Sequence, residues 1–345
     1  MPKVAIIVLI YNGLKYLPAC FGSLKKIDYP KEDLEIIAVD NNSQERTVDY
    51  LKKNFPEITL IESKRNLGYT GGNNLGLRYA LKKNFDYFFI LNHDTEVKAN
   101  FLKELVSLAE KDKKIGILQP KVLLWPETDK IQTSGNKIHY LGFCYSGDCY
   151  QKDYLFGEPK EIAYASGSAM LVRREVLEKI GLFDEDYFMY HEDVDLGWLT
   201  HLAGYKIMVV PRAVVYHKYS FSRNKKKFFW MERNRFWVIL KNYKIGTLIL
   251  IFPAFIFMEI GLIFYSLVSG WFIWKIKSYF SALSGLNKVL EKRKKVQRER
   301  VVGDREFSRY LTGVVKFEDI NNPVLSLANI FFNLYWKITK QLIFW

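Results

Sequence analysis

The sequence predicts an α/β domain with a mostly parallel central sheet, followed by a helical C-terminal region that is both apolar and basic. Two observations lead to this prediction. In the first hundred residues, short apolar segments rich in β-branched residues alternate with helix-like segments. The last hundred residues instead contain long apolar runs separated by runs of lysine and arginine. We therefore expect one domain over residues 1–240 and a second region over residues 241–345.

The composition is that of a globular protein with unevenly distributed charge. The chain has 345 residues, of which 49% are hydrophobic and 26% are charged, so it can bury a large core. Its formal net charge is +14, and residues 201–345 hold 25 lysines and arginines against 8 acids. The excess of basic residues therefore lies in the C-terminal part, and any function of this charge is expected there.

Neither the cysteines nor the N-terminus indicate secretion. The three cysteines are too few for a disulfide framework and form no CxxC metal motif, which favours a reducing cytosolic environment. The apolar run Val4–Ile10 follows a lysine, as in a signal peptide, but it is short, β-branched and ends in an Asn-Gly turn. We expect a buried strand there.

The first ninety residues repeat one unit, an apolar strand followed by a helix. Right-handed crossovers between such strands produce a largely parallel sheet, and ligands bind at the carboxyl ends of its strands. The expected strands are Val4–Ile10, Leu34–Asp40, Ile58–Ser63 and Asp86–Asn92, and the expected helical segments are 14–27, 45–54 and 73–83.

Polar residues follow the expected strands at the ends where ligands bind. The stretch FFILNHDTEV shows this most clearly, because an apolar run breaks directly into Asn92, His93 and Asp94. Asp94 can simply cap the next helix. Against that interpretation, the polar residues after all these strands should meet at one edge of the sheet: Tyr11, Asn12, Asp40, Asn41, Asn42, Ser43, Asn92, His93 and Asp94.

A glycine-rich segment, RNLGYTGGNNLG from Arg65 to Gly76, precedes the third helix. Its backbone N–H groups and helix N-terminus suit a phosphate, but it matches neither the Walker pattern nor the dinucleotide fingerprint, and it can be an ordinary turn. Asp40 is a candidate to accept hydrogen bonds from a base or ribose, or to cap a helix. The two roles of Asp40 are compatible.

A cluster of acids begins a later helix. Glu192, Asp193 and Asp195 lie in its first turn, where the helix macrodipole favours negative charge. Their neighbours Phe188, Tyr190 and Trp198 instead favour a general base held beside a substrate. Strands are expected at 204–211 and 213–217, and the spacing alone does not single out His217 at the end of the second.

Six motifs in order carry a family resemblance: VAIIVLIYNG, EIIAVDNNS, RNLGYTGGNNLG, ILNHDTEV, ASGSAMLVRREVLEKIGLFDEDYFMYHEDVDLGW and VVPRAVVYH. Together they resemble the inverting family 2 glycosyltransferases, and more narrowly the rhamnosyltransferase-like members that build surface polysaccharides. The resemblance covers residues 1–240 and includes the segment ERNRFWVILKNY. It implies a GT-A type fold and a nucleotide-diphosphate sugar donor.

The resemblance also implies roles for individual residues. Asp40 would contact the base or ribose, Asp94 would hold Mg²⁺ or Mn²⁺ between the donor phosphates, and His217 would be a further metal ligand. Asp193 would be the catalytic base that deprotonates the acceptor hydroxyl for in-line displacement at the anomeric carbon. The implied donor-binding residues are Tyr11, Asn12, Asp40, Asn42, Arg65, Asn66, Gly68, Asn73, Asn92, His93 and Asp94, and the implied acceptor or sugar pocket contains Gly167, Ser168, His191 and Glu192.

One position departs from the wider family pattern. Many members have an acid two residues before the metal-binding aspartate, whereas this chain has Asn92, as the rhamnosyltransferase-like branch often does. A neutral amide lowers the negative charge of the site, so we expect metal binding to depend more on the donor phosphates. By branch resemblance the donor is dTDP-rhamnose, with galactofuranose, glucose and N-acetylated sugars as alternatives.

The segment Ile245–Trp274 is apolar over thirty residues with one charge, Glu259. We expect it to break near Glu259 into a re-entrant or interfacial helical pair, with lysines at both ends on the cytoplasmic side. A tilted single membrane span and a buried helix pair of a soluble protein are the alternatives. Residues 287–300 carry seven basic side chains that suit anionic headgroups or solvent, and residues 324–345 suit an interfacial helix.

These C-terminal features predict an enzyme at the cytoplasmic face of the cell membrane, with membrane lipids as partners and a polyprenyl-linked glycan as acceptor. Two other functions are open. The basic part is compatible with nucleic-acid binding, although long apolar runs interrupt it and no nucleic-acid module is present, so we expect no nucleic-acid partner. The α/β domain is also compatible with nucleotidyl transfer to a sugar phosphate, which would release pyrophosphate.

Overall fold

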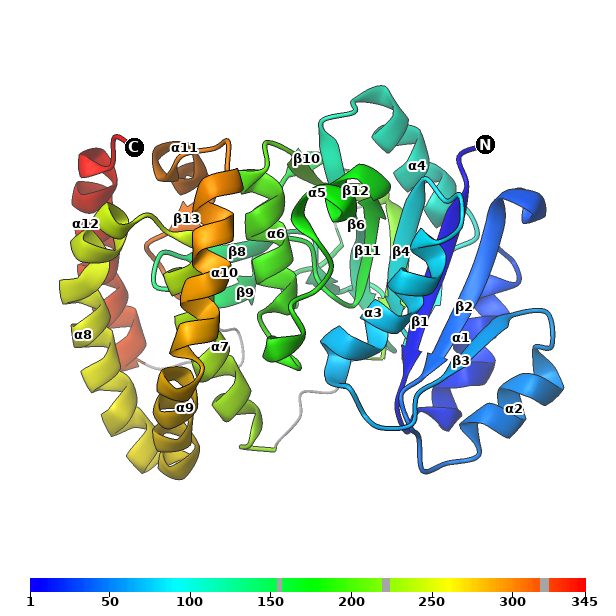
Figure 1. Cartoon of the computed structure of the whole chain (residues 1–345), viewed down its shortest axis with the longest axis horizontal. Helices are drawn as coiled ribbons and strands as arrows, with labels where there is room; N and C mark the ends of the chain where they lie inside the picture. Colours follow the sequence, from blue (N-terminus) through cyan, green and yellow to red (C-terminus); the bar gives the residue numbers. More distant parts are fainter. Residues whose placement is uncertain (154–156, 219–223, 317–322) are drawn as a thin grey trace. The chain divides into compact units, whose positions relative to one another are not determined.

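The computed structural model describes residues 1–153, 157–218, 224–316 and 323–345 (Figure 1). The chain forms two compact units, which are described separately. Unit 1 contains residues 1–136, 146–200 and 205–220, and unit 2 contains residues 137–145, 201–204 and 221–345. The units divide near residue 220, and the expected domain boundary at residue 240 stays a prediction.

Unit 1 is built on one large sheet. Four strands are parallel and adjacent in the order β3 (Thr59–Glu62), β2 (Leu34–Asp40), β1 (Val4–Ile10) and β4 (Tyr87–Asn92). β11 (Ala169–Arg173) is antiparallel to both β4 and the next strand. The sheet continues through β6 (Ile115–Leu124), β12 (Lys206–His217) and β10 (Lys160–Glu161), with β5 (Thr95–Val97) on β12 and β7 (Ile131–Thr133) on β6.

The sheet is therefore mixed, and the expectation of a mostly parallel sheet holds only for its first half. β6 and β12 are parallel, but β11, β10, β5 and β7 each run antiparallel to their neighbours. The sequence pattern does not reveal this, because a strand that is buried on both faces has the same apolar composition in either direction.

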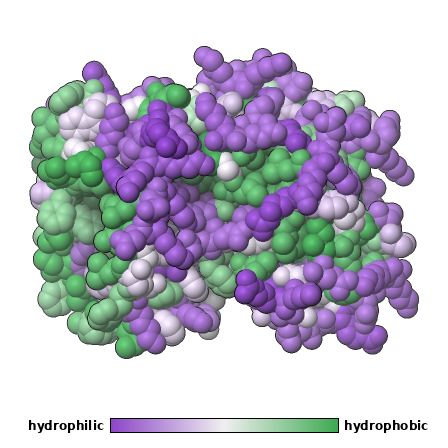
Figure 2. Space-filling view, in the orientation of Figure 1, coloured by the Kyte–Doolittle hydropathy of each residue, from purple (hydrophilic) through white to green (hydrophobic). Residues whose placement is uncertain are grey.

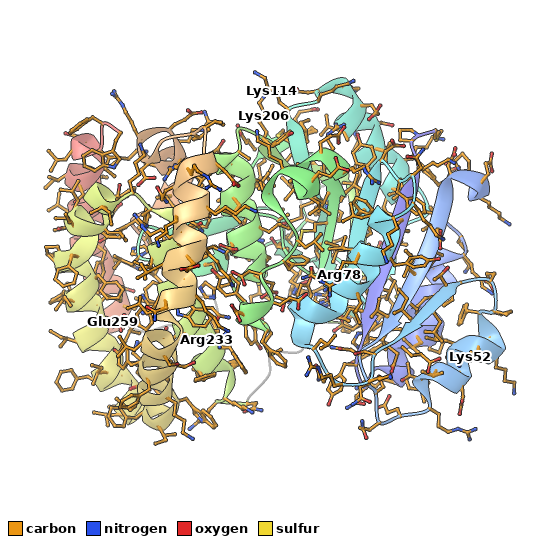
Figure 3. The ribbon with its side chains drawn as sticks, in the orientation of Figure 1. Lys52, Arg78, Lys114, Lys206, Arg233 and Glu259 are labelled. Atoms are coloured by element: carbon orange, nitrogen blue, oxygen red, sulfur yellow. The ribbon has the colours of Figure 1, made fainter. Side chains whose placement is uncertain are left out.

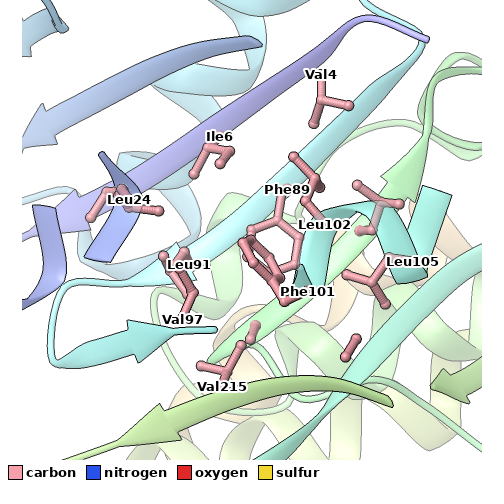
Figure 4. Packing of buried hydrophobic residues seen from close by; sticks show 14 of the residues in the cluster. Val4, Ile6, Leu24, Phe89, Leu91, Val97, Phe101, Leu102, Leu105 and Val215 are labelled. Atoms are coloured by element: carbon pink, nitrogen blue, oxygen red, sulfur yellow. The ribbon is translucent and has the colours of Figure 1, made fainter. Parts of the chain in front are cut away.

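Helices cover both faces of the sheet and close two cores. In β1, Val4, Ile6 and Val8 belong to one core and Ala5 and Ile7 to the other, as the period of two in a strand requires. Figure 4 shows the first core, in which Phe89 of β4 packs against Phe101 at the start of α4. The helices of unit 1 are α1 (Leu17–Leu24), α2 (Thr47–Asn54), α3 (Gly68–Leu81), α4 (Phe101–Lys111) and α5 (Arg174–Ile180), together with most of α6 (Glu192–Leu202).

The expected strands at 4–10 and 34–40 and the helix start at Glu192 are confirmed. The third helix begins at Gly68 instead of residue 73, and Gly68 itself has a left-handed backbone (φ +70°), which glycine adopts without steric cost. The strands expected at 204–211 and 213–217 form one strand, β12, with an irregularity between Val210 and Val214.

Unit 2 is mainly helical. Its small sheet contains β13 (Leu311–Thr312), β8 (Asn136–His139) and β9 (Cys144–Ser146). Its helices are α7 (Lys227–Asn242), α8 (Ile245–Val268), α9 (Phe272–Ser284), α10 (Leu286–Glu299), α11 (Asp304–Phe307) and α12 (Pro323–Leu342).

The expected helix break at Glu259 is wrong. α8 runs without interruption for 24 residues, through Pro253 and Glu259. Glu259 does not end the helix because its carboxylate is buried and paired with Arg235 of α7 and Lys275 of α9. The chain turns only after residue 268, where Gly270 has a φ of +70°, and it returns as α9.

Candidate active site

Asp94 and His217 are 123 residues apart in the chain and face each other in unit 1. Asp94 follows β4, and His217 is the last residue of β12. β5 pairs with β12 so that His217 lies opposite Thr95, and the backbone N–H of Lys218 donates to the carbonyl of Asp94 (2.9 Å). As a result, Nε2 of His217 lies 3.1 Å from Oδ1 of Asp94.

The other ring nitrogen of His217 contacts Gln132 of β7. The distance between Nδ1 and the side-chain Oε1 is 2.7 Å, so the amide oxygen accepts a hydrogen from Nδ1. In the imidazolium both nitrogens donate, Nδ1 to Gln132 and Nε2 to Asp94. When the ring is neutral and Gln132 keeps the proton on Nδ1, the lone pair is on Nε2, where a metal ion can bind. Metal-bound histidines are commonly oriented by this kind of hydrogen bond.

Asp94 is ionised in this environment. Burial raises the pKa of its carboxyl, but the hydrogen bond and charge of His217 outweigh burial and lower the pKa below the ordinary value. One carboxylate and one imidazole suit a divalent transition ion, and the carboxylate suits manganese or magnesium. Within the described ranges no group of three or more His, Cys, Asp or Glu side chains converges.

Asp40, at the end of β2, is buried with one carboxylate oxygen unused. Its Oδ2 accepts a hydrogen bond from the backbone N–H of Ser43 (3.1 Å). Its Oδ1 is buried and has no hydrogen-bond partner among the residues that the structure describes. Since a buried acceptor without a partner is costly, this oxygen is suited to a ligand donor such as a base N–H or a ribose hydroxyl.

The loop after β1 is tied to the loop after β2. The side-chain oxygen of Asn12 accepts from the backbone N–H of Gln44 (2.8 Å), and the backbone N–H of Asn12 donates to Oγ of Ser43 (3.1 Å). Asn12 and Asn42 both have positive φ values, 49° and 66°. Strained backbone of this kind collects at binding sites. Tyr11 stays 42% exposed beside this loop, so its ring is available to a ligand.

The glycine-rich segment is held by Asn41, whose side chain is buried. Its Oδ1 accepts from the backbone N–H of Leu67 (2.9 Å), and its Nδ2 donates to the carbonyl of Gly68 (3.0 Å). The N–H of Gly68 bonds to the side chain of Asn66, and that of Thr70 to the carbonyl of Phe188.

The expectation that these backbone N–H groups cradle a phosphate is therefore wrong for Leu67, Gly68 and Thr70, because protein acceptors already bind them. The exposed guanidinium of Arg65 is the charged group that this segment offers to an anion. Asn73 lies inside α3 with no exposed surface, so it is placed to support the site from within.

A tight, strained turn packs against the start of α3. The N–H of Met189 donates to the carbonyl of Tyr187 (2.7 Å) around Phe188, which has φ 63° and ψ −58°, the values of a γ-turn. A Cβ on Gly68 would lie 2.4 Å from the carbonyl oxygen of Phe188, so only glycine allows this approach. Tyr190 and His191 also have left-handed backbones, with φ values of 66°.

This turn leads directly to the acids of α6. The partly buried carboxylate of Asp193 accepts hydrogen bonds from the backbone N–H groups of Gly167 (3.1 Å) and Val194 (2.8 Å). Burial raises the pKa of Asp193 in spite of these bonds. Glu192 is buried, its Oε2 has no partner in the described part of the chain, and burial followed by the charge of Asp193 raises its pKa well above the ordinary value.

Gly167 and Ser168 connect the two halves of the site. Gly167 bonds to Asp193 through its N–H, and the carbonyl of Ser168 accepts from the N–H of Asn92 (2.9 Å) at the end of β4. The hydroxyl of Tyr69 donates to the carbonyl of Gly167, where any side chain would collide with the ring. Two short hydrogen-bonded links therefore join the α6 acid to the strand that ends before Asp94.

The structure thus brings most of the expected residues to the carboxyl edge of the parallel strands, with differences in detail. His93 packs its ring against Gly13 and bonds to the carbonyl of Leu9 (2.9 Å), which is a supporting position. Sequence reasoning did not assign Gln132, which lies on a short strand without a motif, or Asn41, which appeared only as one of several polar residues after β2. Asn41 could have been found from its position, because it follows Asp40 directly at the end of an expected strand.

The sequence profile described as glycosyl transferase family 2 matches residues 5–181. Among curated proteins, the chain is 28% identical over 165 residues to the low-salt glycan biosynthesis hexosyltransferase Agl10 of Haloferax volcanii, covering 47% of this chain and 51% of that protein. It is 26% identical over 239 residues to the N-acetylglucosaminyl-diphospho-decaprenol L-rhamnosyltransferase of Mycobacterium tuberculosis, covering 64% and 77%. The chain therefore spans about half the length of the first relative and about three quarters of the second.

Solved structures show the same fold at low identity. TarS of S. aureus in complex with UDP has a TM-score of 0.53 at 16% identity, over 98% of this chain and 90% of that one. The mannosyltransferase PcManGT of Pyrobaculum calidifontis, in complex with GDP-Man and Mn²⁺, has a TM-score of 0.53 at 15% identity, over 99% and 86%. These likenesses confirm the expected GT-A type fold.

A third curated relative, the dTDP-rhamnosyl transferase RfbF of Shigella flexneri, is 24% identical over 209 residues, covering 59% of this chain and 64% of that protein. The resemblance to rhamnosyltransferases is thus confirmed by two relatives. The family profile covers more than half of the chain, and the chain therefore belongs to glycosyl transferase family 2.

Proposed function

We propose that the protein transfers a sugar from a nucleotide-diphosphate sugar to an acceptor hydroxyl with inversion of the anomeric carbon, and that Asp193 is the base. The position of Asp193 carries this proposal. Its carboxylate is held by the N–H of Gly167, while the next residue, Ser168, is bonded to the end of β4. These two hydrogen bonds hold the carboxylate of Asp193 at a fixed distance from the end of β4, where we place the donor.

The reaction requires one proton acceptor on this chain. As the acceptor oxygen bonds to the anomeric carbon, the bond from that carbon to the diphosphate oxygen breaks, and Asp193 takes the hydroxyl proton. The nucleoside diphosphate leaves with the electron pair of the broken bond, so no protein acid has to protonate it. Because its pKa is raised by burial, Asp193 is a stronger base than an ordinary aspartate.

Glu192 has a different role from its neighbour. Its buried carboxyl has a pKa well above the ordinary value, first because of burial and then because the negative charge of Asp193 disfavours ionisation of Glu192. We infer that Glu192 stays protonated when Asp193 is ionised and lines the sugar or acceptor pocket together with His191, Gly167 and Ser168.

The pair Asp94 and His217 fits a divalent ion, with Mn²⁺ or Mg²⁺ as the candidates. The orientation of His217 by Gln132 leaves Nε2 toward Asp94, which is the arrangement of a metal ligand. When bound, such an ion supplies charge that stabilises the departing diphosphate. The amide of Asn92 adds no charge, so such an ion would depend on the donor's own phosphates for further ligands. Structural neighbours that contain Mn²⁺ support this assignment.

The nucleotide is assigned to the edge formed by β1 and β2. Asp40 offers an unused carboxylate oxygen to the base or ribose, Tyr11 offers an exposed ring, and Arg65 offers charge to the phosphates. The names of the mycobacterial and Shigella relatives favour dTDP-rhamnose as donor. The mycobacterial name also favours a lipid-linked acceptor. We further propose a position at the cytoplasmic face of the membrane, in contact with membrane lipids.

The experiment measures nucleoside diphosphate release by the wild-type chain and by Asp193→Asn. Donors are dTDP-, UDP- and GDP-sugars with Mn²⁺ or Mg²⁺, and a membrane extract supplies the acceptor. We expect one donor to be consumed by wild type and spared by Asp193→Asn, while Asp49→Asn, an exposed acid on α2, behaves as wild type. Pyrophosphate release in place of nucleoside diphosphate would show nucleotidyl transfer, and equal rates for Asp193→Asn and wild type would reject Asp193 as base.

A further inference from the structure

The outer surface of α8 is apolar along its whole length. Large hydrophobic side chains on this surface are between 42% and 90% exposed, and they recur every three or four residues, as positions on one helix face do. Figure 2 shows hydrophobic residues gathered over α8 and α12. We define the apolar face of α8 by its exposed residues Ile245, Ile249, Phe252, Ile256, Phe257, Ile260, Phe264, Leu267 and Val268.

α12 extends this surface. Its exposed apolar residues also follow a helical repeat, and Phe331 packs against Phe257 of α8 with ring centroids 5.0 Å apart. The hydroxyl of Tyr335 donates to the carbonyl of Leu250 (2.7 Å), which fixes α12 beside α8. The exposed apolar residues of α12 are Leu327, Ile330, Phe331, Leu334, Ile338 and Leu342.

The opposite side of α8 is polar and ion-paired. Glu259 pairs with Arg235 of α7 and Lys275 of α9, and its carboxylate also accepts from Tyr279 (2.7 Å). Near the helix start, Thr247 donates to Asp304 (2.6 Å). Glu259 is labelled in Figure 3. The inward side of α8 therefore carries the one charge of the helix, Glu259, and the polar Thr247.

α8 is the one helix of the described ranges that is long and apolar enough to cross a membrane. Crossing would place α7 and α9, with the ions that bind Glu259, at the depth of the hydrocarbon, where charges are costly. An orientation in the membrane plane avoids this cost, because the side with Glu259 and its ion-pair partners then faces the protein and only the apolar face meets lipid.

We propose that the apolar faces of α8 and α12 dock in one leaflet of a lipid bilayer with anionic headgroups, and that α8 lies in the membrane plane without crossing. Charge complementarity favours this partner, because exposed lysines lie on α12 itself, at Lys337 and Lys340, and on the neighbouring helix α9, at Lys277. Between α8 and α12 the surface is hollowed by an apolar cavity of about 600 Å³, which flexible hydrocarbon chains can fill. The proposal does not depend on the sugar-transfer reaction.

The test measures partition of the full-length chain onto vesicles of phosphatidylcholine with phosphatidylglycerol, and onto vesicles of phosphatidylcholine alone. Ile249→Asp, Ile256→Asp and Phe264→Asp place the same charge at three points over roughly 22 Å of one helix face. In-plane docking predicts that each variant weakens partition by about tenfold or more, and by similar factors, because the three positions lie at one depth. Val301→Asp, at a residue 67% exposed outside both helices, is the matched control and should bind as wild type.

Other outcomes overturn the proposal. A spanning helix predicts the greatest loss at the central Ile256→Asp and small losses at the two ends. Association of two copies predicts a dimer in sedimentation velocity that these substitutions dissociate, with no binding to either vesicle. Circular dichroism of each variant confirms folding, since all three substitutions are at exposed positions.

Discussion

Unit 1 and unit 2 each bury a cluster of charged side chains, and the two clusters differ in how completely the charges are compensated. In unit 2, Glu232 and Glu259 are paired with Arg235 and Lys275, so two acids meet two bases. In unit 1, Glu192 and Asp193 are adjacent. The hydrogen bonds described for Asp193 come from backbone N–H groups, and Oε2 of Glu192 has no partner among the described residues, so no described cation pairs with either acid.

The pKa values of these acids move in opposite directions. Burial acts to raise the pKa of Glu232, but the charges of Arg235 and Lys275 lower it to about 2. Burial raises the pKa of both Glu192 and Asp193, and cations do not reverse it. The comparison teaches that burial alone does not mark a functional acid. A buried acid that lacks compensation is a candidate for chemistry, whereas a compensated one holds helices together.

The largest expected effect is on the compensated cluster. Arg235→Met removes one cation from between two buried carboxylates, so we expect the free energy of unfolding to fall by about 3–5 kcal/mol. Chemical denaturation measures this change. In the double variant Arg235→Met with Glu259→Gln, the charges balance again, and part of the lost stability should return. A loss in the single variant below about 1 kcal/mol would contradict the structural role of this cluster.

A smaller effect is expected at the metal pair. Gln132→Leu removes the acceptor that orients His217, so Mn²⁺ affinity should fall by about 10- to 100-fold. Titration followed by Mn²⁺ paramagnetic resonance, with nucleoside diphosphate present, measures the affinity. Gln132→Glu keeps an acceptor oxygen at this position and should retain most of the affinity. Equal affinity in Gln132→Leu and wild type would remove Gln132 from the site.

The smallest effect is expected for Glu192→Gln, and it depends on pH. The folded pKa of Glu192 is above its ordinary value near 4.5, so its contribution to stability is present below that pH and is lost as pH rises through the folded pKa. The glutamine variant cannot ionise. Its stability relative to wild type should therefore increase with pH above 4.5, by at most about 1.4 kcal/mol per pH unit. Denaturation curves across pH test this, and a constant difference would show that Glu192 is ionised in the fold.

The sequence predicted the local parts of this molecule well. β1 and β2 could be predicted because their apolar runs end at polar residues, and the motifs placed Asp40, Asp94 and Asp193 near strand or helix ends, as observed. These features depend on neighbours in the sequence, and periodicity is a local property.

The parts that could not be predicted depend on distant partners. The continuity of α8 follows from the pairing of Glu259 with residues 24 and 16 positions away, and the orientation of His217 follows from Gln132, 85 positions away. The direction of β11 and the contact of Phe188 with Gly68 are of the same kind. Sequence spacing contains no signal for such contacts.

The role of Asp193 is tested most directly by measuring the transfer rate and the stability of Asp193→Asn on the same preparation. We expect sugar transfer by Asp193→Asn to fall by about 10²- to 10⁴-fold relative to wild type. We also expect the free energy of unfolding at neutral pH to be unchanged or higher, because a partly buried carboxylate with a raised pKa is replaced by a neutral amide. A marked loss of stability with the transfer rate retained would contradict this role, since Asp193 would then be a structural acid like Glu232.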